Sequence, residues 1–278
     1  MPLHGFRNYT FFNLGWAHTS SVTIIATTFV NVPVRVVLNT SNFDYSKVNS
    51  DGSDIRFVSQ TTDDPDTQYL SYWVESWNYN GTSSLWVKVP NSGTKTLYMR
   101  YGNKQALSIS EINNTMESGM RFRYFGATAS FTNLVGGGTC SAPNTDWGGG
   151  AVSVCGVGSS ADNVTVMWDG WVIPIGAVSH IFHGTSDDGQ RLYVNSNLII
   201  NAWVDRGPTE DNATVNMTDT LPKRIQYDWY ENGGGATARL GWTPSGQAKA
   251  YPIPSTNLRS PKYDPSYPDP YSYSATIL

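Results

Sequence analysis

Charged residues are scarce in this chain of 278 residues. Asp, Glu, Lys and Arg together make up 14% of the sequence, whereas an average soluble domain contains about 25%. Serine, threonine, asparagine, glycine and tyrosine fill the gap, so hydroxyl and amide groups should cover the surface. Such a surface is typical of secreted and surface-displayed β proteins and unusual for a cytosolic enzyme. The formal net charge is −4 and no Lys/Arg-rich run occurs, which argues against nucleic-acid binding.

Long apolar runs are also missing. No stretch reaches the roughly 18 apolar residues that a membrane-spanning helix needs, so we expect no membrane span. The most apolar region, residues 22–38, is interrupted by Thr27, Asn31, Pro33 and Arg35 and predicts two strands joined by a turn. The first residues lack the apolar core of a secretory signal peptide. We therefore expect that a signal was removed, that export uses another route, or that a virion protein is released by lysis.

The sequence contains no recognisable catalytic constellation. Of its four histidines, His180 and His183 are three positions apart in a region that reads as strand, where they point to opposite faces. A nucleophile elbow, a phosphate loop and a paired-cysteine zinc pattern are all missing. We predict no enzyme activity, although sequence alone does not reveal a pair of glycosidase carboxylates. Glu75 stands between aromatic residues, and we expect it to pair with Arg56 or Lys88 rather than to catalyse.

Only two cysteines occur, Cys140 and Cys155. A disulfide between them would close a loop of about 15 residues and stabilise the fold by around 3 kcal/mol. The alternative is two free thiols. We favour the disulfide because the composition already indicates an extracellular protein.

Seven Asn-X-Ser/Thr sequons fit a glycosylated surface protein without proving one. They begin at Asn8, Asn39, Asn80, Asn113, Asn163, Asn212 and Asn216.

Strand signals dominate the rest of the chain. In residues 85–89 the side chains of Leu85, Val87 and Val89 fall on one face, and residues 96–101 form another strand after an Asn-Ser-Gly turn. Similar short runs recur every 8 to 14 residues with Gly, Asn or Pro between them. This spacing predicts an all-β fold of sandwiches or barrels.

Two β domains flanked by arms are expected from the changes of pattern along the chain. We assign an N-terminal arm to residues 1–16, a sandwich to 17–112 and a barrel to 118–259. Residues 260–278 are rich in Pro and Tyr, which excludes helix and central strand and predicts an extended arm. Such an arm could pack on its own domains or on a neighbouring copy.

The segment from Trp168 to Leu258 carries the most specific pattern. It contains Ser186-Asp187-Asp188-Gly189-Gln190-Arg191-Leu192-Tyr193, then Asp228-Trp229-Tyr230-Glu231-Asn232-Gly233-Gly234-Gly235 and Arg239-Leu240-Gly241-Trp242. From about Phe122 onward the chain resembles the protective-antigen (PA14) type of β-barrel domain. That family occurs in bacterial toxins, in yeast adhesins and as an accessory module of glycosidases.

The resemblance implies a calcium site at Asp187 and Asp188. In the adhesin branch two consecutive aspartates, often joined by a cis peptide bond, bind one calcium ion that coordinates sugar hydroxyls. Carboxylate oxygens suit calcium, which takes six to eight oxygen ligands. Asn232, in a later loop, is our candidate for a further ligand.

A purely structural turn is the alternative reading of the same loop. In that case Asp187 caps backbone amides and Asp188 pairs with Arg191. We expect Trp203, Trp229 and Trp242 to be core residues rather than sugar platforms.

The N-terminal half resembles an uncharacterised secreted β-sandwich family, domain of unknown function 2341. The likeness rests on Asp51-Gly52-Ser53-Asp54-Ile55-Arg56-Phe57, Tyr72-Trp73-Val74-Glu75-Ser76-Trp77 and Leu97-Tyr98-Met99-Arg100-Tyr101-Gly102-Asn103. It implies an extracellular location and a fold, but no chemistry.

We therefore predict an extracellular or cell-surface structural and adhesive protein. In the preferred hypothesis it is the repeating subunit of a filament, surface layer or virion, and its terminal arms bind copies of itself. The alternative is a calcium-dependent carbohydrate-binding module that acts as a monomer or beside a glycosidase.

Overall fold

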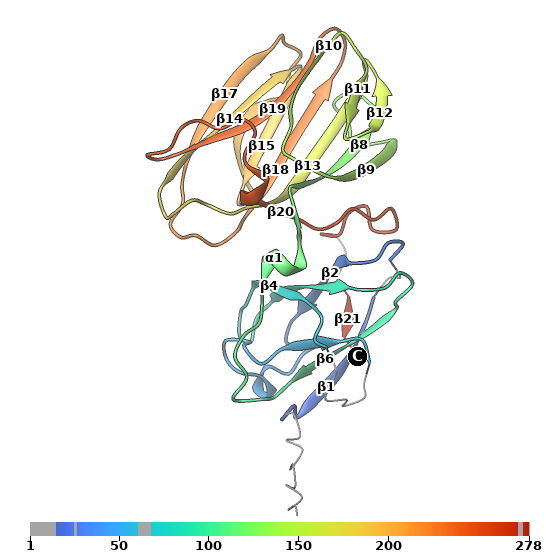
Figure 1. Ribbon diagram of the computed structural model, residues 1–278, viewed down its shortest axis with the longest axis vertical. Coiled ribbons are helices and arrows are strands. Elements are labelled where there is room, and N and C mark those ends of the chain that lie inside the picture. The colour runs from blue at the N-terminus through green and yellow to red at the C-terminus, as the bar shows by residue number, and fades with distance from the viewer. Residues whose placement is uncertain (1–14, 25–26, 61–67, 272–274, 278) are drawn as a thin grey trace, which may run out of the picture.

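The computed structural model describes residues 15–24, 27–60, 68–271 and 275–277, which are almost entirely β-strand and irregular loops. The all-β prediction is confirmed. Two β domains lie one above the other along the long axis, and the short helix α1 (Ile112–Thr115) lies between them (Figure 1). None of the helices in these ranges is long and apolar enough to cross a membrane.

The N-terminal domain is a sandwich of two antiparallel sheets. One sheet has the order β21-β1-β6-β3 and the other the order β2-β5-β4. The elements are β1 (His18–Thr23), β2 (Val32–Leu38), η1 (Tyr45–Lys47), β3 (Arg56–Val58), β4 (Tyr72–Ser76), β5 (Ser83–Val89), β6 (Thr96–Tyr101) and β21 (Thr276–Ile277).

Strand β2 shows why these residues form strands. Val34, Val36 and Leu38 are fully buried, and the alternate residues Arg35 and Val37 are partly exposed, as expected where side chains alternate across a sheet. Pro33 is tolerated because β2 is an edge strand of its sheet.

The C-terminal domain is also a sandwich. One sheet has the order β10-β19-β14-β17, and the other runs β16-β15-β18-β13-β20-β7, with β8 pairing with β13 and β9. The elements are β7 (Glu117–Ser118), β8 (Met120–Phe125), β9 (Leu134–Cys140), β10 (Asn144–Gly148), β11 (Val152–Val154), β12 (Val157–Ser160), β13 (Val164–Val172), β14 (Ser179–Asp187), β15 (Gly189–Val194), β16 (Asn197–Ala202), β17 (Thr209–Asn216), β18 (Lys223–Glu231), β19 (Ala236–Pro244), η2 (Ser255–Asn257) and β20 (Leu258–Ser260).

The two sheets of this domain have free edges and do not close into the barrel that we expected. Aromatic residues fill the space between them, with Trp168, Tyr227, Trp229 and Trp242 all nearly or fully buried. Cys140 and Cys155 form the predicted disulfide, with their Cα atoms 6.6 Å apart.

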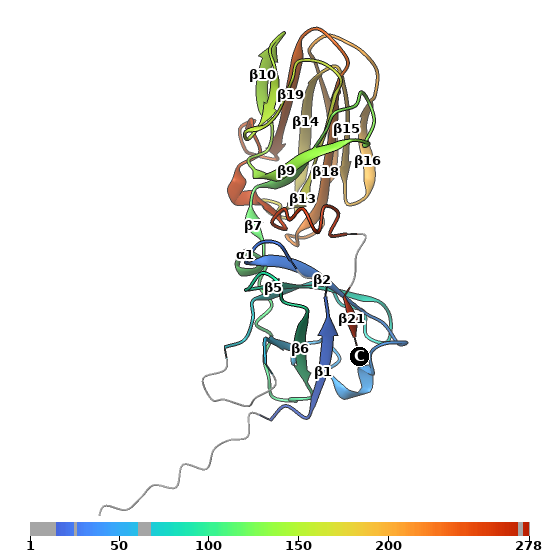
Figure 2. The ribbon, with the colours of Figure 1, turned by 90° about the vertical axis from the view of Figure 1, so that its right-hand side faces the viewer.

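The C-terminal segment packs on its own chain instead of projecting as a free arm. After β20 it runs between the domains, as Figure 2 shows, and ends as β21 beside β1. The Asp264 carboxylate accepts hydrogen bonds from the backbone N–H groups of Thr28 and Phe29, both at 2.8 Å. Of the other predicted arm, residues 1–14 lie outside the described ranges. We call residues 261–271 and 275–277 the strap, because they contact both domains.

The domains also meet through aromatic side chains. Trp171 of β13 packs edge to face on Trp73 and Trp86 of the N-terminal domain, with ring centroids 5.0 and 5.4 Å apart. Glu75 accepts hydrogen bonds from the indoles of Trp86 (2.9 Å) and Trp171 (3.2 Å). The expected pairing of Glu75 with Arg56 or Lys88 is wrong, since Arg56 bonds to backbone carbonyls and Lys88 to the carbonyl of Asn114. Glu75 binds the domains together instead.

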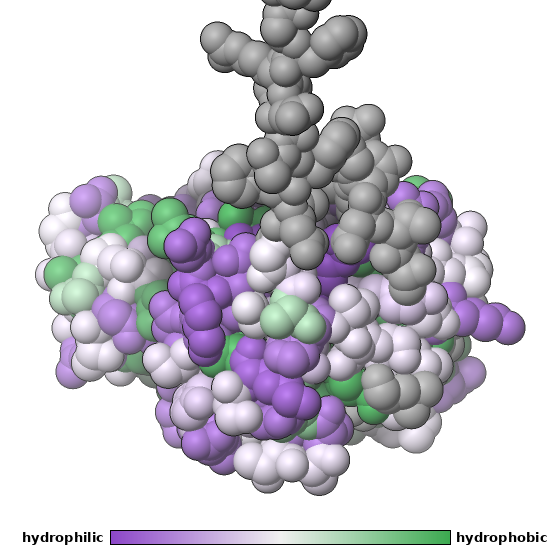
Figure 3. All heavy atoms as spheres, turned by 90° about the horizontal axis from the view of Figure 1, so that it is seen from below, coloured by the Kyte–Doolittle hydropathy of each residue, from purple (hydrophilic) through white to green (hydrophobic). Residues whose placement is uncertain are grey.

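The surface agrees with the low charge of the sequence. On the end of the molecule seen in Figure 3, hydrophilic and neutral residues predominate and hydrophobic residues are scattered between them. Scattered apolar residues of this kind are normal for a soluble surface.

Candidate functional site

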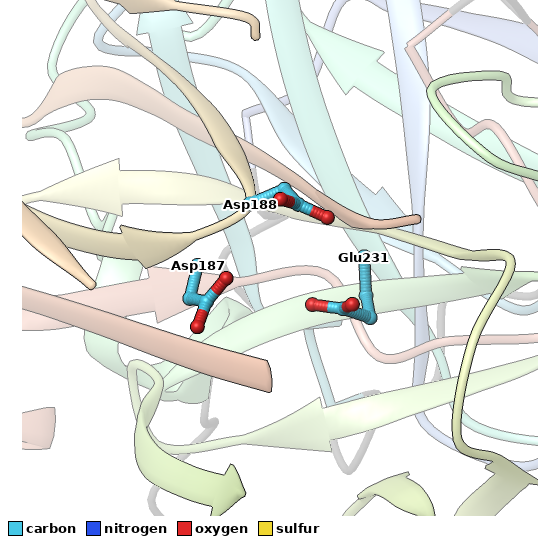
Figure 4. Close-up of side chains that lie close together, drawn as sticks. All are labelled: Asp187, Asp188 and Glu231. Carbon is cyan, nitrogen blue, oxygen red and sulfur yellow. The ribbon is translucent and has the colours of Figure 1, made fainter. Parts of the chain in front are cut away.

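Three carboxylates meet at one end of the C-terminal sandwich. Asp187 is the last residue of β14, Asp188 links it to β15, and Glu231 is the last residue of β18. One oxygen from each of the three lies within 4.8 Å of the others, and Figure 4 shows the side chains facing a common space. Their residues are 8%, 5% and 0% exposed, respectively. We call these residues the acidic cluster.

The backbone of the Asp187–Asp188 turn is held by core groups. The peptide bond between the two aspartates is cis, the arrangement that the PA14 resemblance implied. The Trp229 indole donates to the carbonyl of Asp187 (3.1 Å), and the Asp188 N–H donates to the carbonyl of Tyr230 (3.1 Å). At Gly189 a Cβ atom would lie 2.2 Å from the ring of Tyr230, so a side chain does not fit where the next strand begins.

Asp188 is fixed by backbone donors. Its Oδ1 accepts from the N–H of Arg206 (2.9 Å) and its Oδ2 from the N–H of Asn232 (2.8 Å). The expected pair with Arg191 is wrong, because the Arg191 guanidinium lies over the ring of Trp203, 4.3 Å from its centroid. Asp188, rather than Asp187, is the residue that binds backbone amides.

Glu231 is buried, and in the described part of the chain neither a hydrogen bond of ordinary geometry nor an ion pair compensates for the loss of water around its carboxylate. Among the described residues, neither of its carboxylate oxygens accepts a hydrogen bond of ordinary geometry. Burial, followed by the charges of Asp188, Asp187 and Asp162, raises the pKa of Glu231 to about 8, with only the backbone N–H of Gly233 acting in the opposite direction. Burial and the charge of Asp188 also raise the pKa of Asp187.

The acidic cluster therefore fits a cation. Within the described ranges, no Lys or Arg side chain forms an ion pair with any of its three carboxylates. Buried charges are normally paired or bound to metal, and hard oxygen donors select calcium or magnesium over softer metals. The donor set and the unpartnered Glu231 oxygens meet that requirement.

Asn232 borders the cluster but points its amide elsewhere. Its backbone N–H bonds to Asp188, whereas its side-chain Nδ2 donates to Asp205 at 2.9 Å. Asp205 also accepts from the hydroxyl of Tyr230 at 2.8 Å. The role of Asn232 as a ligand stays a prediction.

The sequence reasoning missed Glu231, although a signal for it existed. Tyr227, Trp229 and Glu231 alternate along β18, so all three share the face that points into the core, and all three are fully buried. An acid that follows two inward-facing aromatics on the same face is a candidate for a buried charged site.

The other candidate residues have structural partners. Trp229 and Trp242 are core residues, as predicted. The prediction that Trp203 is a core residue is wrong: it is half-buried and is contacted by Arg191, Phe131 and Tyr230. The rings of His180 and His183 bond to different groups, the carbonyl of Val178 and the hydroxyl of Thr243.

Most of the predicted sequons are accessible. Asn39 is half-buried and Asn8 lies outside the described ranges, and the exposed members are Asn80, Asn113, Asn163, Asn212 and Asn216. Their glycosylation stays a prediction.

The fold and the site together define a two-domain β protein whose C-terminal sandwich carries a buried acidic cluster. The chain belongs to the PA14 domain family, whose model matches residues 116–255. The model of the domain of unknown function DUF2341 matches residues 51–132.

Known proteins resemble parts of the chain. The anti-sigma-I factor RsgI3 of Acetivibrio thermocellus is 31% identical over 113 residues, which are 41% of this chain and 17% of the relative. An anti-sigma factor domain-containing protein from Clostridium clariflavum has 14% identity and a TM-score of 0.46 over 87% of this chain and 83% of that one. The epithelial adhesin 9 A domain of Candida glabrata, solved with Galβ1-3GlcNAc, has 10% identity and a TM-score of 0.42 over 53% and 94%.

Proposed function

We propose that the C-terminal domain is a calcium-dependent carbohydrate-binding module of an extracellular, surface-associated adhesive protein. The observation that carries the proposal is Glu231, whose two buried oxygens accept no hydrogen bond of ordinary geometry in the described part of the chain and face Asp187 and Asp188. Three carboxylates in one buried space repel one another unless a cation is present. A calcium ion held there would neutralise the cluster and offer coordination positions to sugar hydroxyls.

The chain's own residues prepare the site. Hydrogen bonds from the N–H groups of Arg206 and Asn232 hold the Asp188 carboxylate in one orientation, and the indole of Trp229 holds the carbonyl of Asp187. Such preorganisation lowers the entropy lost on binding. The low charge of the chain and the exposed sequons support a location outside the cell.

A subunit role in a filament, surface layer or virion is our second candidate and ranks lower. It required the C-terminal segment to bind a neighbouring copy, and residues 261–271 and 275–277 are used within their own chain. Assembly through this segment would first require the strap to leave its own domains.

The cation test compares two variants that act in different ways. Calorimetric titration of the EDTA-treated protein with calcium should give binding that Asp187→Asn weakens at least about tenfold, or 1.4 kcal/mol. Glu231→Gln should also weaken calcium binding, yet it should raise the thermal stability of the metal-free protein near neutral pH, because Glu231 must take up a proton to be buried there and glutamine is already neutral. Asp219→Asn, at a half-buried carboxylate of the same domain, should leave calcium binding unchanged and should not raise stability, because it removes the surface ion pair with Lys223.

The carbohydrate test uses the same proteins on a glycan array. Signals should appear with calcium, disappear with EDTA and be lost in Asp187→Asn. Calcium binding without any calcium-dependent glycan signal would reduce the cluster to a structural metal site. Absence of calcium binding would refute the proposal altogether.

A further inference from the structure

A cavity of about 340 Å³ opens beside the disulfide of the C-terminal domain. It lies between β10 and the β11–β12 hairpin, which are neighbours at one side of this domain (Figure 1). Its buried lining includes Ala142, Val154 and Trp168, and the half-buried Trp147 forms another wall. This volume is at the lower end of the roughly 300–1,000 Å³ range of small-molecule sites, so it suits a compact ligand.

The exposed lining residues are neutral hydrogen-bonding groups. Asn144, Thr145 and Ser153 are exposed, and none of their side chains is hydrogen-bonded within the described part of the chain. Hydroxyl and amide groups both donate and accept, which matches neighbouring hydroxyls on a ring. Among the residues that the structure describes, no charged side chain lines the cavity, so a charged ligand would lose its hydration there without compensation.

The aromatic walls favour a ring with one apolar face. Indole surfaces gain dispersion energy from a flat C–H face, and a pyranose presents such a face together with hydroxyls at its rim. The apolar lining, the polar rim and the absence of charge therefore match one class of ligand, a neutral pyranose.

We propose that this cavity binds a single neutral pyranose residue without a cation. None of the residues that line the cavity belongs to the acidic cluster. The two are joined only indirectly, since the ring of Trp147 packs on Trp229 with centroids 5.5 Å apart and Trp229 donates to the carbonyl of Asp187. The cavity is thus a second site, distinct from the proposed calcium site, and it does not depend on that site being correct.

Thr145 provides a variant that blocks the cavity and leaves the core intact. It pairs across strands with Ala238, which is fully buried, so its side chain shares the inward-facing side of the sheet while remaining exposed at the cavity. A Thr145→Phe substitution should fill the space. Thr220→Phe is the matched control, because Thr220 is exposed in the same domain and does not line the cavity.

The experiment is saturation-transfer NMR in EDTA with methyl glycosides of glucose, galactose, mannose and N-acetylglucosamine, and with glucuronate and glucosamine as charged probes. At least one neutral glycoside should bind, Thr145→Phe should weaken it about tenfold or more, and Thr220→Phe should leave it unchanged. Circular dichroism shows whether Thr145→Phe is folded. Should it unfold, Asn144→Ala serves instead and should weaken the same signal.

Three results would overturn the cavity proposal: no neutral glycoside binds in EDTA, only the charged probes bind, or the folded Thr145→Phe variant binds as well as the wild type. Binding that appears only with calcium and is lost in Asp187→Asn would assign the sugar to the acidic cluster. Loss of the calcium effect with retained binding in EDTA would refute the calcium site and keep the cavity.

Discussion

Asp228 is a buried acid whose environment is set by its position in β18. It is 2% exposed, lies on the face opposite Glu231 and accepts a hydrogen bond from Gln226 at 2.9 Å. Burial raises its pKa to about 6, assisted by the charge of Asp169, whereas the Gln226 hydrogen bond and the charges of Arg191 and Arg123 lower it. The folded protein therefore holds this proton to higher pH than the unfolded chain does.

The first prediction concerns Asp228→Asn. Because the folded pKa is raised, the stability from this group is present below about pH 4 and is lost as the pH rises through about 6. The neutral variant should therefore be more stable than the wild type above pH 6, by on the order of 1–3 kcal/mol, and the difference should vanish near pH 4. Urea unfolding at several pH values measures it.

A matched control for this prediction is Glu117→Gln, at a half-buried carboxylate of the same domain. It should not reproduce the gain in stability that Asp228→Asn shows above pH 6. A difference between Asp228→Asn and wild type that is the same at pH 4 and pH 7 would contradict the assignment.

At the residue scale, the sequence predicted what local motifs encode. The Asp187-Asp188 pair was recognisable because both residues lie in one short loop. Glu231 was missed, because its proximity to that loop depends on how β18 and β14 are placed in two facing sheets. The partners of Glu75 were missed for the same reason, since Trp171 is 96 positions away in the chain.

At the scale of elements, the disulfide ties the end of β9 to the turn after β11. Cys140 and Cys155 are 15 positions apart and enclose β10 and β11. Cross-linking a loop of this length removes conformational entropy from the unfolded chain worth about 3 kcal/mol.

The second prediction follows from that loop. The double variant Cys140→Ser with Cys155→Ser should lower the free energy of unfolding by about 2–4 kcal/mol. Guanidinium unfolding without reductant measures this difference. Wild type in reductant should behave like the double variant, and a loss below about 1 kcal/mol would show that the link contributes little.

Strand positions were predictable because side-chain alternation is local, as β2 illustrates with Val34, Val36 and Leu38. Whether the C-terminal domain is a closed barrel or an open sandwich was not predictable in the same way. Whether two sheets close into a barrel depends on their edge strands, here β10 and β17 in one sheet, and alternation is the same in a barrel and in a sandwich.

At the scale of the whole molecule, the strap and the Glu75 contact hold the two domains together. The guanidinium of Arg35 donates a hydrogen bond to the carbonyl of Tyr271, and the backbone carbonyl of Arg35 accepts one from the N–H of Ala275. The ring of Tyr271 also packs on Trp86 and Trp171, one from each domain. Composition alone predicted an extended segment here, but its binding partner is decided by contacts between residues 100 or more positions apart in the chain.

The third prediction is that removal of residues 261–278 uncouples the domains. The N-terminal domain would lose β21, the Tyr271 packing and the two amide bonds to Asp264, so it should melt at a lower temperature than the C-terminal domain. Scanning calorimetry should then show two transitions instead of one. Asp264→Ala should lower the stability of the N-terminal domain alone, by on the order of 1–3 kcal/mol.

A truncated protein that unfolds in one transition at the wild-type temperature would contradict the prediction that the strap couples the two domains. If truncation instead dissolves an assembly seen by light scattering and leaves unfolding unchanged, the segment serves neighbouring copies and the filament hypothesis regains first place.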